Sequence, residues 1–474
     1  MRAIRNFLPC FACLLLLFGC VPLRQSQVDA MLPATPASFS LAPVPTGGKV
    51  DQTWWKSLDS SQLNALIAKA FAESPDLDRT FAHLLQQQAL IGIAHAAQTV
   101  QASVNGAVTR EKQLSLFSSG TGTTMNGSFA ASYEIDLWNR LEQGEKAAHF
   151  FTRASREDVR TAYIMLSGRI AETYVTWIEQ NRQFESAATR TEIAAARLRM
   201  TEKRYRQGLA VAEDIYRARQ AQATAARERS AAGSAVNKSR HELAALTATF
   251  PADFQLNPKE DLPHQPALPA VGLPSDLLLM RPDLRRAFYT VHARDAQVAQ
   301  AIAAQFPSFS ITAAVGGAGL SFGPVSASGA IWKLAMQAAM PLLDGGRIDA
   351  DIDRNKAVLQ EELAMFRSAL FTAVKEVEDA LALFRETGRF LKETQDELAS
   401  VRATVALIKA RYASGLTDAL DLLNGREMLE QARSRLFGAR KAHLSAYITL
   451  VRSLGGNWPD AYIRHRESTQ KRSP

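Results

Sequence analysis

Residues 204–209 (RYRQGL) return at residues 411–416 as RYASGL, 207 positions further along the chain. The same offset relates other landmarks, which are Pro75-Asp76-Leu77 with Pro282-Asp283-Leu284, Ala97-Gln98 with Ala304-Gln305, Arg140 with Arg347, Trp177 with Phe384, and Asp214 with Asp421. Matches that share one offset over about 140 residues indicate a true internal repeat, and a period this long exceeds that of solenoids. The chain is therefore predicted to be a duplicated half-molecule.

Proline placement divides the chain into segments. No proline lies between Pro75 and Pro251, or between Pro341 and Pro459, whereas prolines crowd into 22–45 and 251–282. Proline-rich stretches are typical of extended linkers. This pattern predicts a linker over 20–59, a first repeat over 60–250, a second linker over 251–274, a second repeat over 275–456 and a tail over 457–474.

The proline-free tracts predict long helices. They are rich in Ala, Leu, Glu, Gln, Arg and Lys, and apolar residues recur at three- and four-residue steps, as in Leu166, Ile170 and Tyr174. The expected helices are 60–97, 141–205, 212–248, 276–304, 346–411 and 419–453, with turns, or tips, near 204–213 and 411–420. A helix of this greatest length reaches ~95 Å and must lie along other helices as a coiled coil.

Between the helices the apolar period changes from 3.6 to 2, which predicts hairpins over 99–137 and 306–342. Alternation is clear in 128–137, 308–315 and 332–340 and weaker in 102–110. An apolar face opposite a polar face is typical of a membrane barrel wall, although a half-buried soluble hairpin has the same local pattern. The Gly-, Ser- and Thr-rich stretches 113–127 and 316–329 are expected to be loops at the hairpin ends.

Four strands of about ten residues cannot close a membrane barrel, because the smallest barrels have about eight strands. An open edge in lipid would leave backbone groups without hydrogen bonds. Chains must therefore pool their strands, so that two, three or four chains give eight, twelve or sixteen. A closed ring is expected, and this reasoning leaves the number of chains open.

The N-terminus reads as a signal peptide over 1–19, with a basic start and an apolar run too short to span a bilayer. Leu17-Phe18-Gly19-Cys20 resembles a bacterial lipobox, which implies a covalent lipid on Cys20; an ordinary signal peptide is the alternative. Removal of residues 1–19 lowers the formal charge from +8 to +6 and leaves one cysteine, which excludes an internal disulfide. Export and the lack of a recognition motif argue against a nucleic-acid partner.

The chain resembles the TolC-like outer-membrane efflux proteins, in particular their lipoprotein branch. The residues that carry this resemblance lie at 133–138 (YEIDLW), 272–278 (GLPSDLL), 281–285 (RPDLR), 306–310 (FPSFS), 344–347 (DGGR) and in both RY-x-x-GL turns. The resemblance implies a mainly α fold whose helices form an α-barrel, and a homotrimer with a 12-stranded transmembrane β-barrel. It implies a periplasmic adaptor and an inner-membrane RND-type pump as partners. It also implies an outer-membrane location among membrane lipids, with no cofactor apart from the lipid on Cys20.

Glycine at the two tips is suited to the left-handed conformation that ends a helix, and structurally Gly208 and Gly415 need no further role. The family resemblance implies more. In the family these turns contact the adaptor, so Gly208, Leu209, Gly415 and Leu416 are the expected contact residues.

The resemblance also places a gate just beyond the second tip. The family carries inward-facing carboxylates at the positions of Asp421 and Asn424, so the ring expected here is less acidic. Family gate contacts involve the positions of Tyr412 and Asp214, whereas Thr417 replaces an arginine found in some members. The alternative for Asp421 is an acid that stabilises the start of a helix.

No enzyme is expected, because the chain lacks a nucleophile elbow and a phosphate-binding glycine loop. Asp349, Asp351 and Asp353 resemble the start of a calcium loop, but Arg354 replaces its glycine and Gln360 its glutamate, so no metal site is expected. The expected function is a passive efflux channel for small molecules. The alternatives are a structural coiled-coil lipoprotein of the cell envelope and a channel for type I protein secretion.

Overall fold

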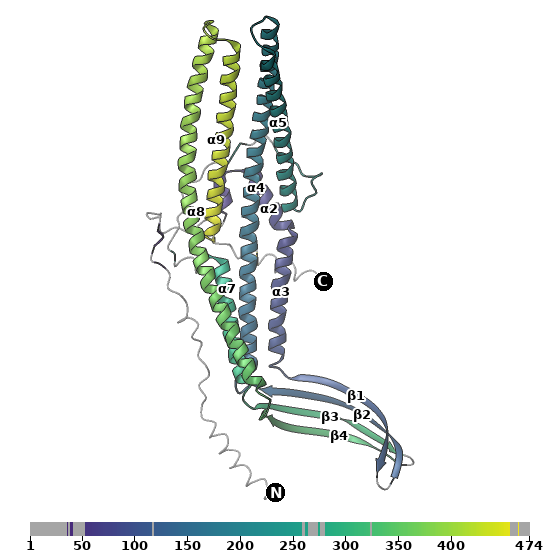
Figure 1. Cartoon of the computed structure of the whole chain (residues 1–474). Coiled ribbons are helices and arrows are strands. Elements are labelled where there is room, and N and C mark those ends of the chain that lie inside the picture. The colour runs from purple at the N-terminus through teal and green to yellow at the C-terminus, as the bar shows by residue number, and fades with distance from the viewer. Residues whose placement is uncertain are drawn as a thin grey trace. The chain divides into compact units, whose positions relative to one another are not determined.

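The computed structural model describes residues 36, 38–40, 53–115, 118–257, 261–263, 274, 280–322, 325–455 and 463 (Figure 1). These residues fall into two compact units. We call His83–Arg156 with Arg286–Ser368 the sheet unit, and Thr35–Ala82, Glu157–Arg285 and Ala369–Pro474 the tip unit. The predicted signal peptide, Cys20, and most of the segments 20–59, 251–274 and 457–474 lie outside the described residues.

The internal duplication is confirmed by the positions of the elements. In the first repeat the long elements are α3 (Pro75–Ala96), β1 (Gln101–Ser115), β2 (Ser118–Ile135), α4 (Arg140–Arg206) and α5 (Ala212–Leu246). Their counterparts, each beginning 207 residues later, are α7 (Pro282–Ala303), β3 (Ser308–Phe322), β4 (Val325–Ala339), α8 (Arg347–Ala413) and α9 (Ala419–Ser453). The mainly helical fold with four strands is confirmed as well.

The single helix predicted over 60–97 is wrong, because the structure has two, α2 (Ser61–Glu73) and α3. A short 3-10 helix, η2 (Trp54–Leu58), precedes them. Ser74, between the two helices, is extended at φ −68° and ψ 120°. The ring of Pro75 disfavours a helical conformation at the preceding residue, yet proline itself fits the first position of α3. The helix predicted over 276–304 corresponds to α7, which begins at Pro282. Residues 275–279 are not described.

The four strands form one antiparallel sheet in the order β1-β2-β3-β4 (Figure 1). They are 15, 18, 15 and 15 residues long, and pairing continues through most of 113–127 and 316–329. The prediction of loops there was therefore wrong. Glycine and serine signal turns locally, but a backbone whose N–H and C=O groups pair with a neighbouring strand needs no large side chain. At Gly316 an added Cβ would lie 2.1 Å from the carbonyl oxygen of Gly127, so glycine is required there by close packing.

The sheet has two chemically different faces, because directly opposed residues share a face. Val104 pairs with Phe129, Phe129 with Val315, and Val315 with Trp332, so four large apolar side chains cross the sheet in a row. We call this side the apolar face; its exposed large side chains are Val104, Val108, Met125, Phe129, Tyr133, Ile311, Val315, Trp332, Leu334 and Met336. The other side, the polar face, carries Ser103, Asn105, Thr109, Glu111, Ser128, Ser132, Glu134, Thr312, Lys333 and Gln337, together with Leu320 and Ile331.

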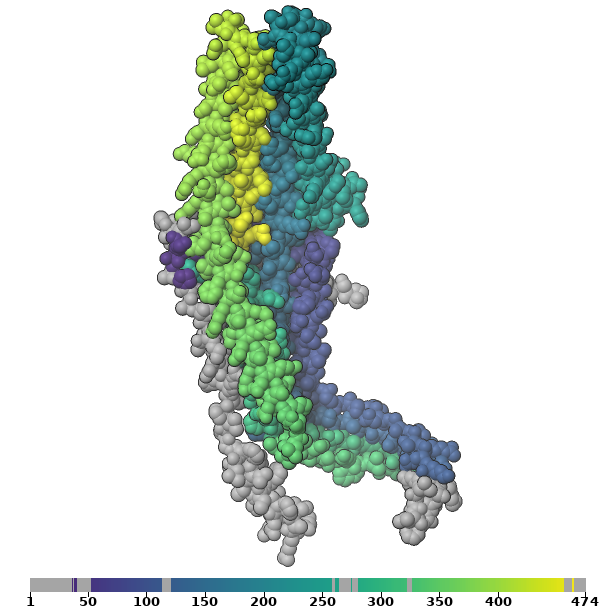
Figure 2. Space-filling view, in the orientation of Figure 1, coloured from purple at the N-terminus to yellow at the C-terminus, as the bar shows by residue number. Residues whose placement is uncertain are grey.

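Helices of the tip unit contact one another in the order α5-α4-α9-α8 (Figures 1 and 2). Ser239 of α5 donates to Gln180 of α4 (2.6 Å), and Gln183 of α4 donates to the carbonyl of Ser434 on α9 (3.0 Å). The contact of α8 with α9 is apolar; its buried residues are Leu391, Leu398, Ala432, Leu436 and Ala439. Alanine and leucine seams thus let these long helices pack side by side. Among the described residues, no helix is long and apolar enough to cross a membrane.

Three of the motifs quoted from the sequence have structural roles. In the tip unit the buried guanidinium of Arg281 bonds Asp283 (2.6 Å), Glu376 (2.7 Å) and the carbonyl of Ser453 (2.9 Å), so it joins the start of α7 to α8 and the end of α9. In the sheet unit Trp138 stacks on Phe306 at 4.8 Å and donates its indole N–H to the carbonyl of Pro307 (2.8 Å). These contacts give residues of all three motifs a role in packing.

Candidate tips and gate

Both RY-x-x-GL turns end their long helix in the same way. Gly208 and Gly415 each have a φ of +72°, in the left-handed region that favours glycine. The N–H of Leu209 donates to the carbonyl of Arg204 at 2.9 Å, and the equivalent bond of the second turn is 2.8 Å. This geometry satisfies carbonyl groups that the end of the helix leaves without partners. The repeated motif therefore has a local backbone cause.

Apolar side chains at the turns are exposed. Leu209 is 65% exposed, Val211 61% and Leu416 70%. Single exposed apolar residues are ordinary on protein surfaces. Here, however, equivalent leucines stand at equivalent turns, so each tip presents an exposed apolar side chain at the same position.

Asp214 and Tyr412 lie close in sequence to the two turns. The carboxylate of Asp214 accepts the backbone N–H of Val211 at 3.1 Å, which caps the start of α5. Tyr412 lies in the last turn of α8 and is 44% exposed. Within the described chain, no hydrogen bond joins these two side chains. A gate contact between their positions therefore remains a prediction.

An ion pair joins the two tips directly. The guanidinium of Arg204, at the end of α4, lies 2.7 Å from the carboxylate of Asp418. Asp418 is also the N-cap of α9, since its other oxygen accepts the N–H groups of Leu420 and Asp421 at 3.0 Å. The bond from the Asp421 N–H, followed by Arg204, holds the pKa of Asp418 below its usual range. One carboxylate therefore both starts α9 and ties it to α4.

The expected ring residues Asp421 and Asn424 lie on the first turns of α9 and are exposed. Asp421 accepts a hydrogen bond from the hydroxyl of Thr417, the residue that replaces an arginine of some family members. The amide oxygen of Asn424 accepts from Arg197 of α4 at 2.6 Å, and the same guanidinium lies 2.8 Å from Glu427. Asn424 is thus held to the neighbouring hairpin.

The sequence did not reveal these links across the tips. Arg204 and Asp418 both lie in segments singled out by the motif, and an aspartate just before a helix is an N-cap signal. Nothing in the spacing, however, pairs residues that are 214 positions apart. Arg197 and Glu427 carry no local signal at all, since each lies within a long charged helix.

The remaining candidates are ordinary charged surface. Asp351 pairs with Arg354 (2.8 Å) and Asp353 with Lys356 (3.3 Å) on the first turns of α8. In the part of the chain that is described, no three His, Cys, Asp or Glu side chains are placed to hold a metal ion. Cys20, the predicted lipidation site, lies outside that part.

Comparison with known proteins gives a consistent result. The sequence profile of the family described as outer membrane efflux protein matches residues 66–249 and 273–456, one match in each repeat. The chain is 28% identical over 403 residues to the probable efflux pump outer membrane protein SepC of Pseudomonas putida, covering 84% of this chain and 83% of that protein. It is 28% identical to the pyoverdine export outer membrane protein OpmQ of the same species, covering 95% and 98%.

Solved structures show the same fold. The outer membrane channel CmeC of Campylobacter jejuni superposes with a TM-score of 0.80 at 19% identity, covering 93% of this chain and 97% of that one. The outer-membrane channel OprN superposes with a TM-score of 0.78 at 22% identity, covering 90% and 98%. With both repeats matched by the family profile, the chain belongs to the outer membrane efflux protein family and is an outer-membrane component of efflux.

Proposed function

We propose that three copies of this chain form a passive tunnel that exports small molecules across the outer membrane. The three four-stranded sheets pool into one 12-stranded barrel, which removes the open edges at β1 and β4 of the single sheet. The helices of the three chains surround the periplasmic part of the tunnel. Such a channel needs no catalytic residue, because the inner-membrane pump supplies the energy.

The apolar face of the sheet is the observation that carries this proposal. From Ile135 to Met125 the face is apolar over ten residue steps of β2, which is about 33 Å along the strand. With a strand tilt of ~40° this is about 25 Å, the height of the apolar band on membrane barrels. Trp332 and Val104 are 81% and 82% exposed on this face, so no described part of the chain covers it at these residues. A coiled-coil spacer would have no use for such a surface.

The tips support docking to a periplasmic adaptor, with an RND-type pump beyond it. Leu209 and Leu416 offer apolar contacts at equivalent turns, and the Arg204–Asp418 pair holds those turns in a fixed relation. Relatives of this chain are named for the efflux of toluene or antibiotics and for the export of pyoverdine. Small organic molecules are therefore the proposed cargo class, and the pump selects among them.

The proposed gate is a ring formed by Asp421 and Asn424 of the three chains, with Tyr412 and Asp214 as neighbouring contacts. Because Asn424 is neutral, the ring has one carboxylate per chain, which favours cations less than two would. Opening requires α8 and α9 to move away from α4, a population shift that adaptor contact drives. The links from Arg204 and Arg197 to α9 oppose this movement.

We further propose that residues 1–19 are removed and that Cys20 carries a covalent lipid. A lipid chain on Cys20 places the mature N-terminus at the membrane without a spanning helix. Mass spectrometry of the mature protein tests this: a Cys20→Ser variant should lose the added lipid mass. A mature wild-type chain without that mass would contradict it.

The channel assignment is tested by single-channel conductance in planar bilayers. Wild type should conduct, and Asp421→Ala should change the conductance and reduce the preference for cations, because three pore charges are lost. Glu213→Ala is the matched control; it removes an exposed acid that pairs with Arg217 at the start of α5. A wild type without conductance would refute the channel, whereas equal conductance of wild type and Asp421→Ala would refute only the gate assignment.

A further inference from the structure

The end of the apolar face farthest from the helices carries a polar rim. Directly beyond Val108 and Met125, the register places Arg110 opposite Thr123, Thr123 opposite Ser321, and Ser321 opposite Ser326. Lys112 follows two residues later on the same side and pairs with Thr121. We call Arg110, Lys112, Thr121, Thr123, Ser321 and Ser326 the cation–hydroxyl rim. Arg110 and Lys112 are both exposed.

The charges of the two faces differ. On the apolar face, the described strand residues include two cations, Arg110 and Lys112, and no acid. The polar face carries Glu111, Glu134 and Lys333. Both cations lie at the border of the exposed apolar band. They resemble the arrangement of basic residues beside a membrane, where each adds attraction to anionic lipid.

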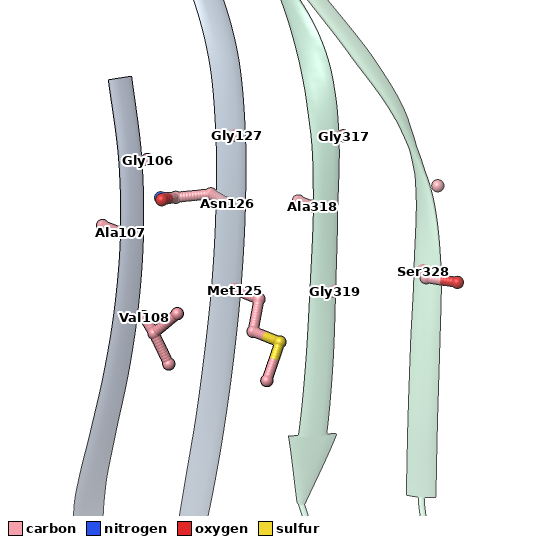
Figure 3. A pocket seen from close by; sticks show the side chains of 11 residues that line it. Gly106, Ala107, Val108, Met125, Asn126, Gly127, Gly317, Ala318, Gly319 and Ser328 are labelled. Atoms are coloured by element: carbon pink, nitrogen blue, oxygen red, sulfur yellow. The ribbon is translucent and has the colours of Figure 1, made fainter. Parts of the chain in front are cut away.

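The surface below the rim is also shaped for lipid. Between the Val104 row and the rim, Gly106, Gly127, Gly317 and Ala330 oppose one another. Small residues there leave a shallow hollow of about 540 Å³, into which Met125 extends toward Gly319 (Figure 3). An acyl chain lying in such a hollow would bring its headgroup level with Arg110. The hollow and the rim therefore fit two parts of one molecule.

We propose that the cation–hydroxyl rim binds the phosphate groups of anionic lipid headgroups in the outer leaflet. Arg110 offers a planar fork of N–H donors suited to phosphate oxygens, and Lys112 adds a point charge. The hydroxyls of Thr123, Ser321 and Ser326 supply further donors along the same row. The inference rests on the proposed function, because it requires the apolar face to lie in a bilayer.

Native mass spectrometry tests it with the mature trimer released from phosphatidylcholine vesicles with and without phosphatidylglycerol. Wild type should retain phosphatidylglycerol over phosphatidylcholine. The Arg110→Gln/Lys112→Gln variant should lose about thirtyfold in this preference, as expected for two basic groups near an anionic surface. High salt should weaken the wild-type preference.

Two variants keep the result interpretable. Lys333→Gln removes a cation from the polar face of the same sheet and should leave the preference unchanged, whereas Arg110→Lys/Lys112→Arg should retain most of it. Full retention by the Gln double variant, or an equal loss in Lys333→Gln, would overturn the proposal. If wild type inserts and conducts but shows no lipid preference, only this inference fails; a wild type that never inserts contradicts the channel as well.

Discussion

At the scale of single residues, Asp418 has two separable roles, as the N-cap of α9 and as the partner of Arg204. Asp418→Ala should lower the stability of the start of α9 by about 1 kcal/mol, because the N-cap is lost. Asp418→Asn keeps a good cap and loses only the exposed ion pair, which contributes about 0.2–1 kcal/mol. Hydrogen exchange of the backbone amides of residues 417–423 measures the effect of both substitutions. Exchange should be faster in the Ala variant than in the Asn variant, and equal exchange in both would contradict the separation of roles.

The same carboxylate gives a pH dependence at the second tip. The pKa of Asp418 is lowered in the folded chain. Its contribution to the stability of the tip is therefore complete above the unfolded pKa of 3.8 and is lost as the pH falls through the lower folded pKa. Amide exchange at 417–423, corrected for intrinsic rates, should therefore rise below about pH 4 in wild type. In Asp418→Asn this rise should be absent. A rise of equal size in that variant would assign the effect to other groups.

Residue-scale prediction from sequence succeeded where the cause is local. Gly208 and Gly415 were expected to be left-handed because a helix ending imposes that conformation, and both have a φ of +72°. The links from Arg204 to Asp418 and from Arg197 to Asn424 were missed. They depend on which faces of two distant hairpins meet, and that is decided by packing over the whole length of the helices.

At the scale of elements, the strands are longer than the sequence pattern indicates. The alternation of apolar and polar residues identifies only those parts of the strands where large apolar side chains recur, such as 128–137 and 332–340. The extensions are rich in Gly, Ser and Thr, and glycine and serine favour turns locally. Pairing with a neighbouring strand overrides that preference. At Gly316 of β3, the close approach of β2 explains why no side chain is tolerated. The break between α2 and α3 at Ser74, by contrast, follows from Pro75 and is predictable from the sequence.

Gly316→Ala tests this account of the strands. The added Cβ would meet the carbonyl oxygen of Gly127 at 2.1 Å, so β2 and β3 must separate. We expect a loss of about 1–3 kcal/mol, typical of overpacking, seen as a lower melting temperature of the assembled protein. Gly329→Ala is the matched control on the neighbouring strand, because nothing lies within 4 Å of its added Cβ. Equal melting temperatures for the two variants would show that the close approach is not required.

At the scale of the whole molecule, the duplication follows from a single sequence offset, and the structure repeats it element by element. The need for several chains follows from the number of strands in one chain, since four strands cannot close a barrel. The number of chains does not follow from the chain's own residues. It rests on the family resemblance, because contacts between separate chains are not encoded in any local pattern of one chain.

The central claim is that three chains pool their strands, and the native mass of the mature protein in mild detergent tests it most directly. The account predicts a stable particle of three chains, with the apolar face of each sheet covered by detergent. A monomer that persists across several mild detergents would contradict it, because a single four-stranded sheet leaves two open edges and cannot form a pore.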